Sequence, residues 1–338
     1  MKIDSPQLQV HFLLGFERSG TTLLSQLLNA HSQAISPPEN LFLLQFYDRF
    51  KDKKQWQKLD IDFLVEHILW QGMKSMHLWN VDKEMLKTAL YPLLPNTDYP
   101  TIVRTIYAQF VLAKEKADLK IVIDKNNPFA YHFEKLQVIF PDAKFIFLVR
   151  DYRGVFLSRK QKKVFYKSQD PYISGMMWKM INQKIFENLT QKIVVRYEDL
   201  VEKPERVLTM ICNYLSIPYE SAMLDYEGNL NRMMEQIDDA KTKEMMRFIG
   251  ASLFKPIDKT LSLKWKDSLS KKEIKTLDAV CQPFAQHFDY ETEYDLTSFA
   301  PSKSMFNQLH FQFVFKPLMK YQFSDVFSTG FLKRFIHK

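Results

Sequence analysis

The most constraining feature of this chain is the stretch of residues 12–24, FLLGFERSGTTLL. A short apolar run leads into a turn of small and polar residues and then into a helix-like continuation. This order predicts a strand, a tight loop and a helix. In such an arrangement the peptide N–H groups of the loop and of the helix N-terminus converge on an anion, and the helix dipole adds partial positive charge. We therefore expect a loop that binds phosphate or sulfate.

The residues inside this loop narrow its chemistry. Gly15 and Gly20 have the spacing of the first and last glycines of a nucleotide-binding P-loop, but Thr21 and Thr22 follow in place of the P-loop lysine. Kinases and ATPases use that lysine with Mg²⁺ at the β- and γ-phosphates, so triphosphate chemistry is disfavoured. No G-x-G-x-x-G occurs, which disfavours dinucleotide binding. Arg18 is the cation within the loop, and an ordinary strand–turn–helix remains the alternative.

The rest of the chain alternates strand-like and helix-like patterns. Short apolar runs at 10–14, 119–123, 145–149 and 193–195 are separated by helical patterns, which we expect at 22–30, 62–71, 102–116, 130–140, 152–162, 204–215 and 271–288. Such alternation is typical of a parallel sheet that is covered by helices on both faces. We therefore predict an α/β, P-loop-like, three-layer fold.

A second candidate anion site follows the strand at 145–149. In open α/β sheets ligands bind at the carboxyl ends of the strands, and Arg150 stands at such an end. Ser158 comes eight residues later, about two helical turns on. An arginine fork with a hydroxyl suits a phosphate monoester. The alternative is a surface ion pair of Arg150 with Asp151, followed by a solvated basic helix.

A third strand end carries another cation. The run IVIDKNNPF at 121–129 places Lys125 directly after the strand, although a plain surface lysine is the ordinary alternative. Because the carboxyl ends of parallel strands share one edge of a sheet, we expect Arg18, Lys125 and Arg150 to gather positive charge along that edge. This expected convergence is the main argument for an anionic ligand.

Candidate bases are less clearly marked. Glu39 lies in the proline-stiffened loop SPPENLF, where it is either a held carboxylate or an ordinary acid at a helix start. His31 and His132 are alternative bases. Each falls at a helix face or helix end, so we interpret both as structural or surface histidines.

Taken together, these segments resemble the sulfotransferase family, whose donor is 3′-phosphoadenosine-5′-phosphosulfate. The likeness is carried by GFERSGTTLL at 15–24, DKNNPF at 124–129, FLVRDYRGVFLS at 147–158, RYEDLVEKP at 196–204 and LSLKWK at 261–266. It covers roughly residues 10–290, and it is closest to the bacterial and tyrosylprotein-type enzymes. The combination is specific, although no single segment is.

The resemblance implies a role for each matching position. It implies that the 5′-phosphosulfate is held by Arg18, Ser19, Gly20, Thr21, Thr22 and Leu23. It implies that the 3′-phosphate is bound by Arg150 and Ser158, with Lys162 and Lys264 as further candidates. No metal is implied, and a P-loop nucleotide kinase of unusual sequence or a non-catalytic adenosine-phosphate binder are the rival functions.

The catalytic base is also assigned through the resemblance. Glu39 falls where tyrosylprotein-type enzymes keep a catalytic carboxylate, and Lys125 where they keep a lysine. Cytosolic members use a histidine near the latter segment, whereas this chain has Asn127 there. We therefore expect Glu39 to remove the acceptor proton, while Arg18 and Lys125 stabilise the leaving phosphate during in-line displacement. The expected acceptor is a hydroxyl, or an amine, on a small molecule, glycan or lipid.

The composition restricts which partners and which cellular location we expect for this protein. Lys and Arg number 47 against 39 Asp and Glu, a net charge of +8, but acids are interspersed with the bases, which argues against nucleic acid as a partner. Cys212 and Cys281 are isolated in apolar contexts and read as buried thiols. Asp4 and Pro6 occupy the place of a secretory apolar segment, so we expect a cytoplasmic protein.

The end of the chain differs in character, and we predict one sulfotransferase domain over 1–300 with a Phe/Lys-rich extension at 301–338. Its phenylalanines at 311, 313 and 315 alternate like one strand face, and those at 323, 327, 331 and 335 form a helical stripe. Three interpretations remain open: packing onto the domain, a homo-oligomer interface, and a peripheral membrane helix.

Overall fold

The computed structural model describes residues 7–70, 79, 81–162, 170–235, 240, 243–244, 247 and 256–297. The predicted extension at 301–338 lies outside the described residues, so its role and the boundary near residue 300 stay predictions. The chain divides into two compact units. The first comprises residues 1–15, 20–148 and 190–259, and the second comprises 16–19, 149–189 and 260–338.

The first unit is built on a five-stranded parallel sheet with the strand order β2-β3-β1-β4-β5. The strands are β1 (Gln9–Leu14), β2 (Ala34–Ile35), β3 (Ile121–Asp124), β4 (Phe145–Val149) and β5 (Lys192–Arg196). The four apolar runs therefore form strands, which confirms the predicted α/β fold. The two-residue strand β2 was not predicted, because two residues are too short for a periodic signal.

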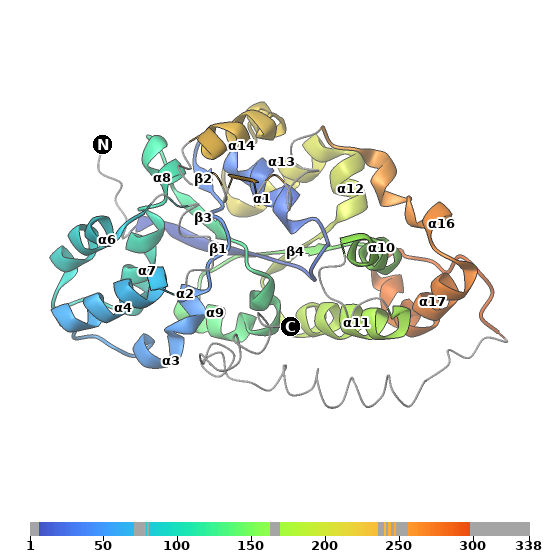
Figure 1. The fold of residues 1–338 in the computed structure, drawn as a ribbon, viewed down its shortest axis with the longest axis horizontal. Helices are drawn as coiled ribbons and strands as arrows, with labels where there is room; N and C mark the ends of the chain where they lie inside the picture. Colours follow the sequence, from blue (N-terminus) through green and yellow to red (C-terminus); the bar gives the residue numbers. More distant parts are fainter. Residues whose placement is uncertain are drawn as a thin grey trace. The chain divides into compact units, whose positions relative to one another are not determined.

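Helices cover both faces of this sheet, as Figure 1 shows for α1 and α13 on one side of the strands and α9 on the other. Side chains alternate between the faces along a strand. Leu13 of β1 accordingly joins a buried cluster with residues of α1 and α13. Its neighbour Phe12 faces the other way, and its ring packs against the rings of Phe129, Phe140 and Phe145. The predicted three-layer arrangement is therefore present in this unit.

The helices of the first unit include one in each predicted helical range. They are α1 (Thr21–Asn29), α2 (Phe42–Gln45), α3 (Tyr47–Phe50), α4 (Lys58–Trp70), α6 (Lys83–Leu90), α7 (Tyr99–Tyr107), α8 (Val111–Glu115), α9 (Phe133–Ile139), α12 (Tyr197–Glu202), α13 (Pro204–Leu215) and α14 (Tyr226–Glu235), with 3-10 turns η2 (Tyr91–Leu93), η3 (Asn127–Tyr131) and η4 (Ser221–Leu224). Helices α2, α3, α6, α12 and α14 were not predicted. The single helix expected over 102–116 was wrong. α7 ends at Tyr107 and α8 begins at Val111, and between them the fully buried ring of Phe110 packs on Trp79.

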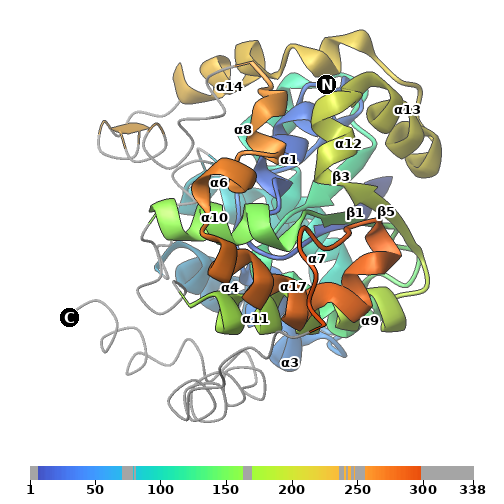
Figure 2. The same ribbon diagram turned by 90° about the vertical axis from the view of Figure 1, so that its right-hand side faces the viewer.

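The second unit is a helical cluster, which Figure 2 shows with α17 beside α11. Its elements are α10 (Tyr152–Lys162), α11 (Pro171–Asn188), α16 (Trp265–Ser268), α17 (Lys271–Ala285) and η7 (Gln286–Phe288), and the turn η6 (Lys259–Ser262) overlaps the two units. The sequence patterns did not predict α11, although Asp170 caps this helix and Pro171 begins it. Trp178 of α11 anchors the cluster, because it is fully buried and its ring N–H donates to the carbonyl oxygen of Arg150 over 2.9 Å.

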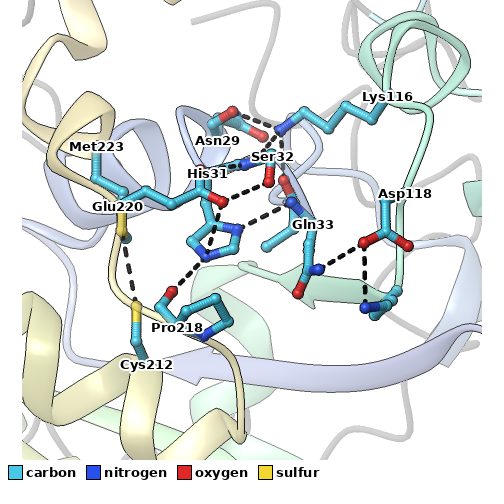
Figure 3. Close-up of polar contacts among 12 residues, drawn as sticks. Asn29, His31, Ser32, Gln33, Lys116, Asp118, Cys212, Pro218, Glu220 and Met223 are labelled. Carbon is cyan, nitrogen blue, oxygen red and sulfur yellow. Dashed lines mark hydrogen bonds and ion pairs between the residues drawn. The ribbon is translucent and has the colours of Figure 1, made fainter.

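The far end of α1 is held by a half-buried lysine, as seen in Figure 3. The ammonium group of Lys116 donates to the carbonyl oxygens of Asn29 and His31, each at 2.6 Å, and to that of Ala34. Helix C-termini leave carbonyl groups without helical partners, and here one side chain satisfies several of them. Burial lowers the pKa of Lys116 to about 8.

His31 forms a second tie at the same end of α1 (Figure 3). Its Nδ1 accepts from the backbone N–H of Gln33 at 2.9 Å, so the proton is on Nε2, which donates to the carbonyl oxygen of Pro218 at 2.7 Å. Glu220 accepts from both the backbone N–H and the hydroxyl of Ser32. With both ring nitrogens engaged and the side chain fully buried, His31 serves a structural role here.

The structure also describes the two cysteines and bears on whether a described helix could cross a membrane. Cys212 and Cys281 are buried free cysteines, which confirms that prediction. Within the described residues, none of the helices combines the length and the apolar character that crossing a bilayer requires.

Candidate active site

The turn between β1 and α1 has the backbone geometry of an anion-binding loop. Gly20 caps α1 in the left-handed region, at φ 96°, and a Cβ there would lie 2.4 Å from the ring of Tyr197. At Gly15 a Cβ would lie 2.6 Å from the carbonyl oxygen of Leu148. Only glycine fits either position without a shift of its neighbours. The first turn of α1 contains no acid, so its N–H groups, from Thr21 on, remain suited to an anion.

In the second unit, three of the predicted donor-binding residues lie together. Arg18, itself at φ 66°, donates through Nε to the hydroxyl of Ser158 at 3.1 Å. Arg150 donates through Nη1 to the carbonyl oxygen of Arg18 at 3.2 Å, and through Nη2 to that of Leu261 at 3.2 Å. Within this unit, Arg18, Arg150 and Ser158 thus present two cations and a hydroxyl as one group.

The electrostatics of this group favour an added anion. Burial, followed by the nearby positive charge of Arg150, lowers the pKa of Arg18, and Glu17 opposes that effect. Two guanidinium groups so close together repel each other unless negative charge lies between or beside them. In the described part of the chain, the fully buried hydroxyl of Ser19 has no hydrogen-bond partner. A phosphate or sulfate ester would supply both the missing charge and the missing acceptor.

In the first unit, the lysine and carboxylate proposed for catalysis form an ion pair. The ammonium group of Lys125, at the end of β3, contacts the Glu39 carboxylate and donates to the hydroxyl of Thr22 at 3.2 Å. The Lys125 side chain is 7% exposed, whereas that of Glu39 is 36% exposed. Glu39 is therefore oriented by a buried cation while one face stays open to solvent. Through Thr22 the pair also touches the first turn of α1.

A further acid in this region was not assigned a role by sequence reasoning. Asp124, the last residue of β3, is buried and accepts from Tyr107 and from the side-chain amide of Asn126, the latter at 2.6 Å. Burial raises its pKa to about 7, and the negative charge of Glu39 adds to that rise. A carboxylate inside the apolar run IVID was the available signal, because acids are rarely fully buried without a reason.

The alternative of a surface pair between Arg150 and Asp151 does not describe this region. Asp151 is buried and accepts instead from Arg153, at 2.8 Å, and the guanidinium group of Arg153 lies 4.0 Å from the ring centroid of Trp265. This contact fixes the segment LSLKWK on α10. The start of α10 is therefore a packed structure, and the solvated-helix reading is wrong for this part.

Two weaker candidates for the 3′-phosphate are Lys264 and Lys162. Lys264 is exposed immediately before α16, and the contact of this segment with Arg150 is made by Leu261. Lys162 ends α10, and its side chain lies outside the described residues. Their roles stay predictions from the resemblance.

Comparison with known proteins decides the family. Residues 11–221 match the sequence profile described as the Sulfotransferase family. The chain belongs to the sulfotransferase family. The match covers more than half of the chain and includes the loop, Glu39, Lys125, Arg150 and Ser158.

Named relatives agree with this assignment. The sulfotransferase is 27% identical over 259 residues to omega-hydroxy-beta-dihydromenaquinone-9 sulfotransferase Stf3 of Mycobacterium bovis, covering 67% of this chain and 62% of that protein. It is 21% identical over 305 residues to protein-tyrosine sulfotransferase A of Caenorhabditis elegans, covering 83% of this chain and 67% of that one. Both the bacterial and the tyrosylprotein-type likeness are thus confirmed.

Among solved structures, the sulfotransferase domain of the Synechococcus PCC 7002 olefin synthase matches with a TM-score of 0.57 and 25% identity, covering 86% of this chain and 98% of that domain. This structural match confirms the predicted fold. The protein is an enzyme of the sulfotransferase class.

Proposed function

We propose that this sulfotransferase moves the sulfuryl group of 3′-phosphoadenosine-5′-phosphosulfate to a hydroxyl acceptor by in-line displacement, with Glu39 as the base. The observation that carries the proposal is the ion pair of Glu39 with the buried Lys125, which also contacts Thr22 in the first turn of α1. A base and a cation held against a phosphate-binding helix are what this reaction requires.

The donor would be held by the residues that the resemblance named. In the proposal, the peptide N–H groups of Gly20, Thr21, Thr22 and Leu23, with the hydroxyl of Ser19, bind the 5′-phosphosulfate. Arg18 adds charge to that group, and Arg150 with Ser158 binds the 3′-phosphate. The buried hydroxyl of Ser19 and the crowded guanidinium groups of Arg18 and Arg150 support the assignment.

The proposed chemistry then follows from positions and charges. A phenol has a pKa near 10, and a sugar or lipid alcohol a higher one, so the acceptor must lose its proton as it attacks. Glu39 takes this proton, a bond forms from the acceptor oxygen to sulfur, and the bond from sulfur to the 5′-phosphate oxygen breaks. Negative charge develops on that leaving oxygen, where Lys125 and Arg18 stabilise it.

The acceptor class is the least constrained part of the proposal. The names of the two relatives describe acceptors that carry hydroxyl groups, a protein tyrosine in one and an omega-hydroxy menaquinone in the other. We propose a hydroxyl acceptor on these grounds. Cytoplasmic location, and membrane or subunit contact through the extension at 301–338, stay predictions from the sequence.

Replacing Glu39 by alanine or glutamine tests the proposal. Formation of the bisphosphate product from the donor, measured with phenolic, peptidyl-tyrosine and lipid-alcohol acceptors, should fall by about 10²–10⁴-fold, the usual contribution of a general base. Affinity for 3′-phosphoadenosine-5′-phosphate, measured by calorimetry, should stay within about threefold, because Glu39 has no part in holding it.

Two results would contradict this assignment. Full turnover by Glu39→Gln would remove Glu39 as the base. Thermal stabilisation by ATP with Mg²⁺, but none by 3′-phosphoadenosine-5′-phosphate, would point to the nucleotide-kinase alternative, because a ligand that binds only the folded protein raises its melting temperature.

A further inference from the structure

The proposed donor-binding loop contains an acid that its function does not explain. Glu17 lies between Phe16 and Arg18, and its side chain is only 19% exposed. A carboxylate repels phosphate and sulfate esters, so its presence in an anion-binding loop is unfavourable unless another group neutralises it.

Arg159 of α10 supplies that neutralisation. Its Nη1 lies 2.9 Å from Oε1 of Glu17, and its side chain is 3% exposed. The same guanidinium group lies 5.3 Å from the ring centroid of Phe16. Burial raises the pKa of Glu17, whereas the charges of Arg159 and Arg18 act in the opposite direction. Arg159 thus faces the loop from α10 and is buried against it.

The contact completes a series of ties within the second unit. Arg150 donates to the backbone of Arg18, Arg18 donates to Ser158, and Arg159 pairs with Glu17. The first two contacts use groups that the donor itself would contact. The third contact, between Arg159 and Glu17, uses a loop residue to which the proposal gives no part in binding the donor. This contact can therefore persist whether or not donor is bound.

We propose that Arg159 is a positioning residue of the donor-binding loop, which it serves by neutralising the charge of Glu17. The inference rests on the proposed function, because it assumes that this loop receives the anionic donor. Without Arg159, the Glu17 carboxylate would stand beside Arg18 and compete with the donor for its positive charge. An unpaired charge in a buried position is among the more disruptive changes a protein can suffer.

A double-mutant cycle at Glu17 and Arg159 separates neutralisation of the Glu17 charge from packing of the Arg159 side chain. Arg159→Met should weaken binding of 3′-phosphoadenosine-5′-phosphate at least tenfold by calorimetry, whereas the double variant Glu17→Gln with Arg159→Met should return to within about threefold of the wild type. The double variant restores the net charge of the loop but not the packing of Arg159. If Arg159 acted through packing alone, the double variant would bind as weakly as the single one.

A neighbouring ion pair provides the matched control. Lys160, the next residue of α10, pairs with Glu273 at 2.7 Å, outside the loop. Lys160→Met should leave donor-product affinity within about twofold. If Arg159→Met does not fold, Arg159→Lys takes its place: it keeps the charge, so binding should stay within about threefold, and a tenfold loss would overturn the neutralising role.

The outcomes distinguish this inference from the proposed function. If the wild-type chain does not bind 3′-phosphoadenosine-5′-phosphate, the proposed donor site is wrong and the role of Arg159 falls with it. If the wild type binds and Arg159→Met binds equally well, only the role of Arg159 is refuted. If the single variant loses affinity and the double variant does not recover it, neutralisation of Glu17 is refuted.

Discussion

Replacing Asp124 by asparagine should flatten the dependence of this protein's stability on pH. Asp124 is buried at the end of β3, and its pKa is raised from its ordinary value of 3.8 to about 7, mainly by burial. In the unfolded chain the pKa returns to the ordinary value. Because the folded value is the higher one, protonated Asp124 stabilises the fold at low pH, and this contribution is lost as the pH rises through 7.

The magnitude follows from the two pKa values. Each pKa unit of difference is worth about 1.4 kcal/mol, so ionising Asp124 costs about 4 kcal/mol more in the folded chain than in the unfolded chain. Part of the stabilisation by protonated Asp124 is already lost at pH 5. Between pH 5 and pH 8 the free energy of unfolding of the wild type should therefore fall by about 2.5 kcal/mol relative to that of Asp124→Asn.

Urea unfolding followed by tryptophan fluorescence at pH 5, 6, 7 and 8 measures this difference. Asp118→Asn is the matched control, because Asp118 is exposed and a hydrogen bond from Lys120 holds its pKa below the usual range. Asp118 therefore titrates outside the interval measured. Parallel pH profiles for the wild type and Asp124→Asn would refute the reasoning, since they would mean that Asp124 is already ionised at pH 5 in the folded chain.

Other substitutions test the loop and the proposed phosphate site. Arg150→Ala should weaken binding of 3′-phosphoadenosine-5′-phosphate by about 1.5–3 kcal/mol, the range for hydrogen bonds to charged groups, and should affect adenosine 5′-phosphosulfate much less because it lacks the 3′-phosphate. Equal calorimetric losses for the two ligands would contradict that role. Gly20→Ala should destabilise the protein by about 2 kcal/mol or more, because the left-handed backbone alone costs about 1–2 kcal/mol and the added carbon would meet the ring of Tyr197. Gly228→Ala, inside α14, is the comparison, because Gly228 lacks the left-handed backbone and its added Cβ would lie 3.3 Å from Oδ2 of the Asp225 side chain; thermal unfolding should show an effect within about 1 kcal/mol. An equal loss of stability at both glycines would argue against the special geometry at Gly20.

Local sequence signals accounted for some elements closely, although α11 was missed despite its Asp170 cap and Pro171. The helix at 204–215 was predicted to the residue, because Pro204 starts it and an apolar stripe runs along it. The same approach failed between Tyr107 and Val111, where the helical pattern continues but the helix ends and the ring of Phe110 is buried against Trp79. Tertiary packing overrides a local preference when the buried area outweighs the lost helical hydrogen bonds.

For the candidate site, the sequence alone determined which residues stand in the loop and at the ends of strands, because strand and loop positions follow from local pattern. It placed Arg18, Lys125 and Arg150 there, and the resemblance added Glu39. The sequence did not determine the partners of these side chains. Those partners are brought together by segments far apart in the chain, and sequence spacing carries no information on such distances.

The tertiary structure decided these pairings. Glu39 reaches Lys125 across 86 residues, and Arg18 reaches Ser158 across 140. Folding also decided which acids would be costly to ionise: burial at the end of β3 raises the pKa of Asp124. A sequence records the acids and bases of a site, whereas their charges and contacts depend on the solvent that the fold excludes and on the neighbours that it supplies.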